Sequence, residues 1–263
     1  MNRKLALPHP PVLTVAGLAV TSAFWLKHWF ATASVGDLLW ILAPVAGLVH
    51  QVSGYEFVLD PEQGFVNIAS ATIIAPACSG INFLLITFLM LVVQGLMALK
   101  RWSLCLAWLL ASAVFSFMVT VTVNGARILC SIWLYQHQIA YGLLTMERLH
   151  RLCGVVLYYS ALLLIFYGAG SVLASIRQDD RKATRRVIAL LPLFCYIAGT
   201  IVVPLLTRET FNTLFWEHCL VVAVVAGSLT VLLQGTPLAT LRQHLFQRPQ
   251  TRHDDNNDPH RRR

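Results

Sequence analysis

A cysteine beside an apolar segment is the first residue of this sequence whose type and position suit chemistry. Cys78 lies in Ala-Pro-Ala-Cys-Ser-Gly (residues 75–80), immediately before a long apolar run. We expect its sulfur at the N-terminus of a helix, where the partial positive charge favours the thiolate, which is the form that attacks a carbonyl. The alternative is a structural cysteine at a helix start, with Ser79 as the N-cap residue.

An arginine closes the next apolar run. Arg127 ends Asn-Gly-Ala-Arg (residues 124–127), directly after the apolar residues 102–123. Asn124 and Arg127 are three residues apart, so they share one helical face. A guanidinium presents a fixed fork of donors to a carbonyl, a developing oxyanion or a carboxylate. The alternative is an arginine whose side chain extends to a lipid phosphate.

A histidine precedes the apolar run 153–175. An imidazole can titrate near neutral pH, so His150 is a candidate general acid or base. Glu147 either orients His150 or pairs with Arg151, four residues further on. The alternative for His150 is an interfacial histidine with no catalytic part. Asn124 and Arg151 are further candidates, as substrate-binding residues.

Composition indicates which elements must position these side chains. Of the 263 residues, 57% are hydrophobic and 12% are charged, and the mean hydropathy is +0.65. Soluble domains carry about 25% charged residues. The apolar residues form runs of about 17 to 25, which suits helices that cross a hydrocarbon core of about 30 Å. The sequence therefore predicts an all-α polytopic membrane protein with about six transmembrane helices, interfacial helices and a small outer-face capping segment.

The net charge of +8 does not indicate a nucleic-acid partner, because the basic residues stand at the ends of apolar runs and in a tail. This pattern indicates contact with membrane lipid. The segments predicted to cross are 12–30, 79–99, 102–123, 153–175, 187–206 and 217–234. A seventh, 37–53, is short and contains a proline, so we expect an outer-face interfacial helix there. Seven spans with the N-terminus outside are the alternative.

The positive-inside rule orients these segments. The loop 177–186 holds five basic residues, which places it in the cytoplasm and residues 124–152 outside. Fifteen of the 20 Lys and Arg residues then lie inside, and five lie outside: Lys27, Arg127, Arg148, Arg151 and Arg208. Cys78, Arg127 and His150 fall together on the outer side of the membrane.

Composition also divides the chain into five parts. They are a signal-anchor helix (1–36), an outer-face interfacial helix and capping loop (37–77), a catalytic transmembrane core (78–175), a C-terminal transmembrane hairpin (176–240) and a basic, disordered cytoplasmic tail (241–263). We expect short strands or a hairpin within 54–75. Residues 128–145 are polar in the middle and too short to span, which predicts an interfacial helix and a loop.

The other cysteines do not indicate a cofactor. The six cysteines form no CxxC pair and no Cys/His cluster at metal-ligand spacing, so we expect neither a metal nor another cofactor. We interpret the five cysteines other than Cys78 as small apolar side chains that pack among their neighbours. Cys153, three residues after His150, is the example closest to the candidate site.

Three short motifs in this order resemble the exosortase and archaeosortase family of membrane-embedded cysteine transpeptidases. They are Ala77-Cys78-Ser79-Gly80 for the A-C-S-G element, Asn124 and Arg127 for N-x-x-R, and His150 and Gly154 for H-x-x-x-G. The resemblance covers roughly residues 54–175. The short N-terminal part resembles the compact exosortase K branch.

The resemblance implies a cysteine peptidase or transpeptidase, with Cys78 as nucleophile, His150 as acid/base and Arg127 as the third catalytic residue. It implies exported proteins as partners, each with a C-terminal sorting signal of the PEP-CTERM type. Such a signal combines a short Pro-containing motif, a transmembrane helix and a basic cluster. It also implies a multi-pass protein of the cytoplasmic (inner) membrane whose active site faces the outer side.

Two other classes of function would leave their own marks in the sequence. A non-enzymatic membrane transporter or assembly subunit would be indicated by intramembrane acids or inverted repeats, and the sequence has neither. A lipid-modifying enzyme would need paired acids or His/Asp clusters at an interface. Only isolated acids stand near the outer ends of the spans: Asp37, Glu147, Glu209 and Glu217.

Overall fold

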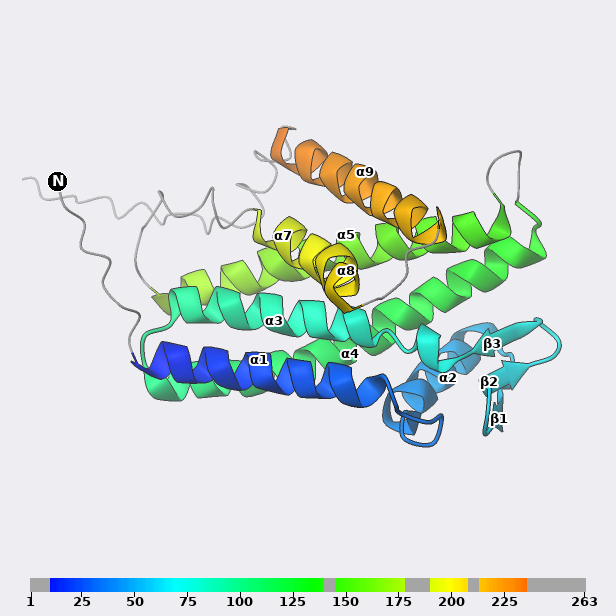
Figure 1. Cartoon of the computed structure of the whole chain (residues 1–263), viewed down its shortest axis with the longest axis horizontal. Helices are drawn as coiled ribbons and strands as arrows, with labels where there is room; N and C mark the ends of the chain where they lie inside the picture. The colour runs from blue at the N-terminus through cyan, green and yellow to red at the C-terminus, as the bar shows by residue number, and fades with distance from the viewer. Residues whose placement is uncertain (1–9, 140–144, 178–189, 208–212, 236–263) are drawn as a thin grey trace, which may run out of the picture.

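The computed structural model describes residues 10–139, 145–177, 190–207 and 213–235. Long helices lie side by side along the longest axis of the molecule (Figure 1). They are α1 (Pro10–Phe30), α3 (Ile81–Ala98), α4 (Trp102–Gln136), α5 (Met146–Arg177) and α9 (Thr213–Gly235). A further apolar helix packs against α3 and α5 and changes its winding midway. It consists of α7 (Leu191–Ile197), the π-helical segment η3 (Ala198–Val202) and α8 (Val203–Thr207).

One end of this bundle carries a small cap, which is named the capped end below. The cap consists of helix α2 (Leu39–Ser53) and the strands β1 (Val58–Asp60), β2 (Gly64–Asn67) and β3 (Thr72–Ile74). The strands form an antiparallel sheet in the order β1-β2-β3 (Figure 1). The prediction of short strands in this region is confirmed, although the third strand was not foreseen.

Four helices among the described residues are long and apolar enough to cross a membrane. They are Pro76–Ala98, Trp102–Gln136, Met146–Ile176 and Thr213–Leu232. The predicted spans 12–30 and 187–206 are not among them, and the second appears as a shorter apolar helix, Leu191–Leu205. At 15 residues, α2 is about 22 Å long, less than the hydrocarbon thickness of about 30 Å. By length and composition, these four helices support the predicted class of helical membrane protein.

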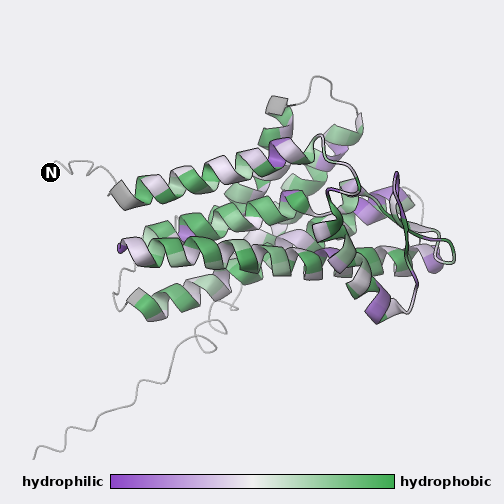
Figure 2. Cartoon of the chain, turned by 90° about the horizontal axis from the view of Figure 1, so that it is seen from below, coloured by the Kyte–Doolittle hydropathy of each residue, from purple (hydrophilic) through white to green (hydrophobic). Residues whose placement is uncertain are grey.

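Burial identifies α3 as the central helix. In an 18-residue stretch of α3, 67% of the residues are buried, against 22% in α4 and 22% in α9. The surrounding helices turn large apolar side chains outward, for example Phe24, Leu110, Leu164, Phe194 and Leu220. Figure 2 shows hydrophobic residues along the helices and hydrophilic residues gathered toward the capped end. So much exposed apolar surface suits contact with lipid and not with water.

Helix α4 corrects one prediction. Its 35 residues form one unbroken helix of about 52 Å, so residues 128–136 continue the helix and do not form a separate interfacial one. The reason is tertiary cover: Ile128 and Ile132 are buried in a core shared with α2 and with the start of α3. Gly125 lets α2 come close, since a Cβ there would lie 2.7 Å from the Leu48 side chain. Similarly, α5 begins at Met146, which puts His150 inside its second turn.

Candidate active site

Cys78 sits in a short turn between the sheet and the central helix. Strand β3 leads into the 3₁₀ turn η1 (Pro76–Cys78), and α3 begins at Ile81. The position predicted for Cys78, just before a helix N-terminus, is confirmed. The backbone amide of Cys78 donates to the Ala75 carbonyl at 2.8 Å, which holds the turn closed.

Gly80 makes this turn possible. Its φ of +80° is one that residues with a Cβ rarely adopt. A Cβ at Gly80 would also lie 3.0 Å from Thr120 Cγ2 and 3.3 Å from Asn124 Cγ. Gly80 occupies the N-cap position of α3, and the buried Ser79 hydroxyl has no hydrogen-bond partner among the described residues. The alternative in which Ser79 caps the helix is therefore wrong.

Asn124 ties the cysteine turn to α4. This side chain is completely buried, and its Nδ2 donates to the Cys78 carbonyl oxygen at 2.6 Å. Its Oδ1 accepts from Arg127 Nη1 at 3.2 Å and from the Tyr158 hydroxyl at 2.8 Å. These contacts use both ends of the amide and connect three elements of the fold. They make Asn124 a positioning residue, whereas its predicted part in substrate binding stays a prediction.

Arg127 points into the interface between α4 and α5. Its Nη1 donates to the Tyr158 hydroxyl at 3.0 Å, and its Nη2 bonds to His150 Nε2 at 2.8 Å. The charge of the guanidinium also acts on the nearby side chain of Cys78, whose backbone carbonyl is held by the same Asn124 that bonds to Arg127. This geometry removes the alternative of an arginine extended to lipid, since both terminal nitrogens are engaged inside the protein.

The charge of Arg127 is not balanced by an acid. No ion pair to Arg127 occurs in the part of the chain that the structure describes, and its side-chain hydrogen-bond partners there are an amide, a phenol and an imidazole. The Tyr158 ring adds a cation–π contact, with the guanidinium carbon 5.6 Å from its centroid. A cation that only neutral dipoles hold in place favours any negative charge that forms beside it.

Donor and acceptor roles assign the tautomer of His150. A guanidinium only donates, so Nε2 must be the acceptor, and a neutral imidazole then carries its proton on Nδ1. Nδ1 lies 2.6 Å from Ser131 Oγ, and the Ser131 hydroxyl donates to the Arg127 carbonyl oxygen at 2.8 Å. Both ring nitrogens are thereby satisfied, and the ring is fixed against α4.

Gly154 leaves room for the arginine to reach the histidine. A Cβ at this position would lie 3.2 Å from Arg127 Nε and 3.5 Å from its Cδ. The first distance is tighter than an ordinary carbon contact, so a larger side chain would push the guanidinium away from His150. The close approach of Arg127 thus explains why a glycine suits the last position of the H-x-x-x-G element in this fold.

Two members of the network, Ser131 and Tyr158, were not foreseen from the sequence. Helical spacing was the available signal. Residues 124, 127 and 131 lie on one face of α4, and residues 150, 154 and 158 lie on one face of α5. Ser131 lies one turn after Arg127 on α4, and Tyr158 lies two turns after His150 on α5. Both could have been expected as neighbours once Arg127 and His150 were placed on adjacent helices.

Arg151 lies outside this network. It pairs with Glu147 at 3.4 Å and with Glu217 of α9 at 3.9 Å, and it donates to the Leu214 carbonyl at 3.3 Å. Glu147 therefore pairs with Arg151, which decides between the two parts considered for this acid. These contacts fasten α5 to α9, and the predicted part of Arg151 in substrate binding stays a prediction.

A pair of cysteines lies one turn from the arginine and the histidine. The sulfurs of Cys130 and Cys153 are 2.8 Å apart, and both thiols are free. Cys153 thus packs between α4 and α5, in agreement with the expected packing role. Among the described residues, no group of three or more His, Cys, Asp or Glu side chains could hold a metal ion.

The site thus defined is a Cys-Arg-His cluster at the capped end of a helical membrane protein, with Asn124, Ser131 and Tyr158 as its supports. Comparisons with protein-family models, with curated proteins and with solved structures find no match for this chain.

Asn124→Leu is expected to lower the stability of the detergent-extracted protein by about 3 kcal/mol. The change leaves the Cys78 carbonyl, the Arg127 guanidinium and the Tyr158 hydroxyl short of a partner, and each such group costs roughly 1–3 kcal/mol. Thr122→Ala is the control, because Thr122 is exposed on the same helix and bonds only to the Met118 carbonyl. Thermal unfolding of both variants checks this, and equal midpoints would contradict the positioning role.

Proposed function

We propose that this protein is a membrane-embedded cysteine peptidase or transpeptidase of the exosortase/archaeosortase type, which cleaves C-terminal sorting signals of exported proteins. The observation that carries the proposal is Arg127, a cation for which the described residues show no carboxylate partner. It bonds to His150, and Asn124 connects it to the Cys78 backbone. Cysteine-dependent acyl transfer develops negative charge on the sulfur and then on the carbonyl oxygen. A fixed cation beside the cysteine is suited to stabilise both charges.

The proposed reaction assigns one task to each side chain. The Cys78 sulfur attacks the scissile carbonyl carbon while its proton passes to His150 Nε2, and Arg127 donates to the resulting oxyanion. His150 then gives this proton to the leaving amine as the C–N bond breaks, which leaves a thioester at Cys78. Water, an acceptor amine or a glycan precursor attacks the thioester and regenerates the thiol. The reaction needs no metal and no organic cofactor.

The proposed substrate carries a short Pro-containing motif, a transmembrane helix and a basic cluster. The lipid-facing surfaces of the bundle allow a substrate helix to lie in the bilayer beside the enzyme. The cleavage site would then stand at the membrane surface, close to the capped end where Cys78 lies. Exported membrane-anchored proteins and lipid are thus the proposed partners.

The decisive experiment is loss of the nucleophile. Cys78→Ala is expected to abolish processing of a co-expressed reporter that ends in such a sorting signal, because no other group supplies the attacking sulfur. Cys153→Ala is the matched control and should keep most processing, since its sulfur packs against Cys130. Mass spectrometry of the wild-type enzyme with reporter should also detect an acylated Cys78. Wild-type processing by Cys78→Ala would rule out covalent catalysis by this cysteine. A transporter or assembly subunit would then be the preferred function.

Arg127→Lys tests whether the geometry of the guanidinium matters beyond its charge. A lysine cannot donate to Tyr158, His150 and an oxyanion from one rigid fork. Loss of one oxyanion donor lowers rates on the order of 10² to 10³. We therefore expect Arg127→Lys to lose most processing while it accumulates normally in membranes. Arg148→Lys, which can keep its ion pair with Glu217 two residues from His150, should process near the wild-type rate. Equal effects of the two changes would argue against the proposed part of Arg127.

We also propose a topology of six crossings in the cytoplasmic membrane, with 12–30 and 187–206 added to the four long apolar helices and with the active site on the outer side. The 15 to 5 distribution of basic residues supports it. Reporter fusions after Lys100, Gln138 and Asp180 should give inside, outside and inside. A cytoplasmic signal at Gln138 would place the Cys-Arg-His cluster on the wrong side for exported substrates.

A further inference from the structure

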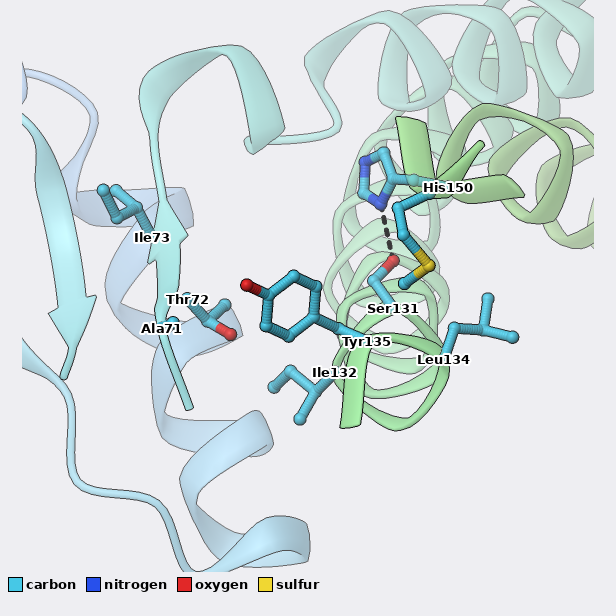
Figure 3. Close-up of a pocket in the computed structure, with 9 residues that line it drawn as sticks. Ala71, Thr72, Ile73, Ser131, Ile132, Leu134, Tyr135 and His150 are labelled. Carbon is cyan, nitrogen blue, oxygen red and sulfur yellow. Dashed lines mark hydrogen bonds between the residues drawn. The ribbon is translucent and has the colours of Figure 1, made fainter. Parts of the chain in front are cut away.

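A pocket of about 210 Å³ opens beside His150 at the capped end. One wall is the start of β3, with Thr72 and Ile73, and the opposite wall is formed by Ser131, Tyr135 and His150 (Figure 3). In Figure 3 a second strand stands on the other side of β3, away from Tyr135. The pocket therefore borders the edge of β3 that faces the candidate active site.

That edge of β3 is not used by the sheet. Among the described residues, β3 pairs with β2 alone, with Val66 opposite Ile73 and Asn67 opposite Thr72. Backbone groups of alternate residues in an edge strand point away from the partner strand and need other hydrogen-bond partners. Extended peptides bind such edges by adding a strand, with main-chain hydrogen bonds for affinity and neighbouring pockets for specificity.

We propose that the substrate polypeptide binds in this pocket as an added strand on the free edge of β3. This inference rests on the proposed function and names how the same site holds its substrate. The side chains of Ser131 and Tyr135 would lie along the other side of the bound segment. Cys78 follows the last residue of β3 by four positions. A segment bound along β3 would therefore lie close to the nucleophile.

The composition of the pocket favours a peptide over a lipid tail. Its walls include the hydroxyls of Thr72, Ser131 and Tyr135 and the imidazole of His150, beside apolar residues of α4 and α5. An acyl chain would leave the backbone donors and acceptors of the unpaired strand edge without hydrogen bonds, whereas an extended peptide can bond to them. A segment that contains proline is compatible, because the added strand is itself an edge strand, where a missing N–H can face solvent.

The opposite edge of the sheet provides the matched control. Strand β1 is also an edge strand, but its Val58 is 71% exposed and lies outside the pocket. Thr72→Phe, which fills the pocket, is expected to lower reporter processing at least tenfold, and Val58→Phe should stay within twofold of wild type. Iodoacetamide is small and reacts with a thiol without binding to the edge of β3. Its alkylation of Cys78 should therefore proceed at the wild-type rate in both variants.

These readouts separate the inference from the proposed function. Wild-type processing by Thr72→Phe would overturn strand addition while the enzyme stays intact. Absence of processing by the unmodified protein, with normal Cys78 alkylation, would overturn the proposed function itself and with it this inference.

Cross-linking keeps the inference testable if Thr72→Phe does not fold. A photoreactive benzoylphenylalanine in place of Tyr135, in the Cys78→Ala background that cannot release substrate by cleavage, should cross-link to the reporter polypeptide. The same group in place of Trp133, which is exposed on α4 outside the pocket, should not. Cross-links at position 135 to lipid alone, identified by mass, would overturn the proposal in favour of a lipid site.

Discussion

The contact between Arg127 and His150 is the interaction on which the arrangement of the site depends. A guanidinium at a helix–helix interface is costly to desolvate unless dipoles surround it. Asn124 Oδ1, the Tyr158 hydroxyl and His150 Nε2 supply three acceptors, and the Tyr158 ring supplies a π face. Because all of these groups are neutral, the cation is held without being neutralised. An acid in place of any of them would have satisfied Arg127 and removed its capacity to stabilise a second negative charge.

The fold brings Cys78 to this cation through backbone geometry more than through side-chain packing. Strand β3, the turn η1 and Gly80 form a rigid lead into α3, and Asn124 clamps the Cys78 carbonyl from α4. The small cap matters for the same reason. It covers the C-terminal part of α4, so that this helix can extend beyond the length needed to cross a bilayer. Arg127 and Ser131 lie in this extended part, at the level of the cysteine. The site is thus assembled where membrane helices meet a folded surface layer.

The sequence alone was enough to predict the helical membrane class, the short strands of the cap and the helix-start position of Cys78. It also selected Asn124, Arg127 and His150, which the structure brings into one network. It did not predict Ser131 or Tyr158, because a serine or a tyrosine in an apolar helix is ordinary until a neighbour gives it a partner. The length of α4 was misjudged for a related reason: the polar residues near Gln136 indicate solvent, while tertiary cover by α2 decides where the helix ends. The proposed crossings by 12–30 and by 187–206 rest on apolar composition. Within the second, the structure describes a shorter apolar helix that contains a π-helical segment.

The resting hydrogen bonds also bear on the order of events in the proposed reaction. Arg127 Nη2 occupies the lone pair of His150 Nε2, and Nδ1 is committed to Ser131, so the imidazole has no free site for the thiol proton. A substrate carbonyl beside Cys78 offers Arg127 a competing acceptor, and the developing oxyanion is a stronger one than a neutral imidazole. As the guanidinium turns toward that oxygen, Nε2 becomes free to take the proton. Base and oxyanion donor would therefore become available in the same movement, and only when a substrate is bound. In an enzyme that must hold an acyl intermediate for a chosen acceptor, this coupling would keep the cysteine–histidine pair from acting before the sorting signal is in place.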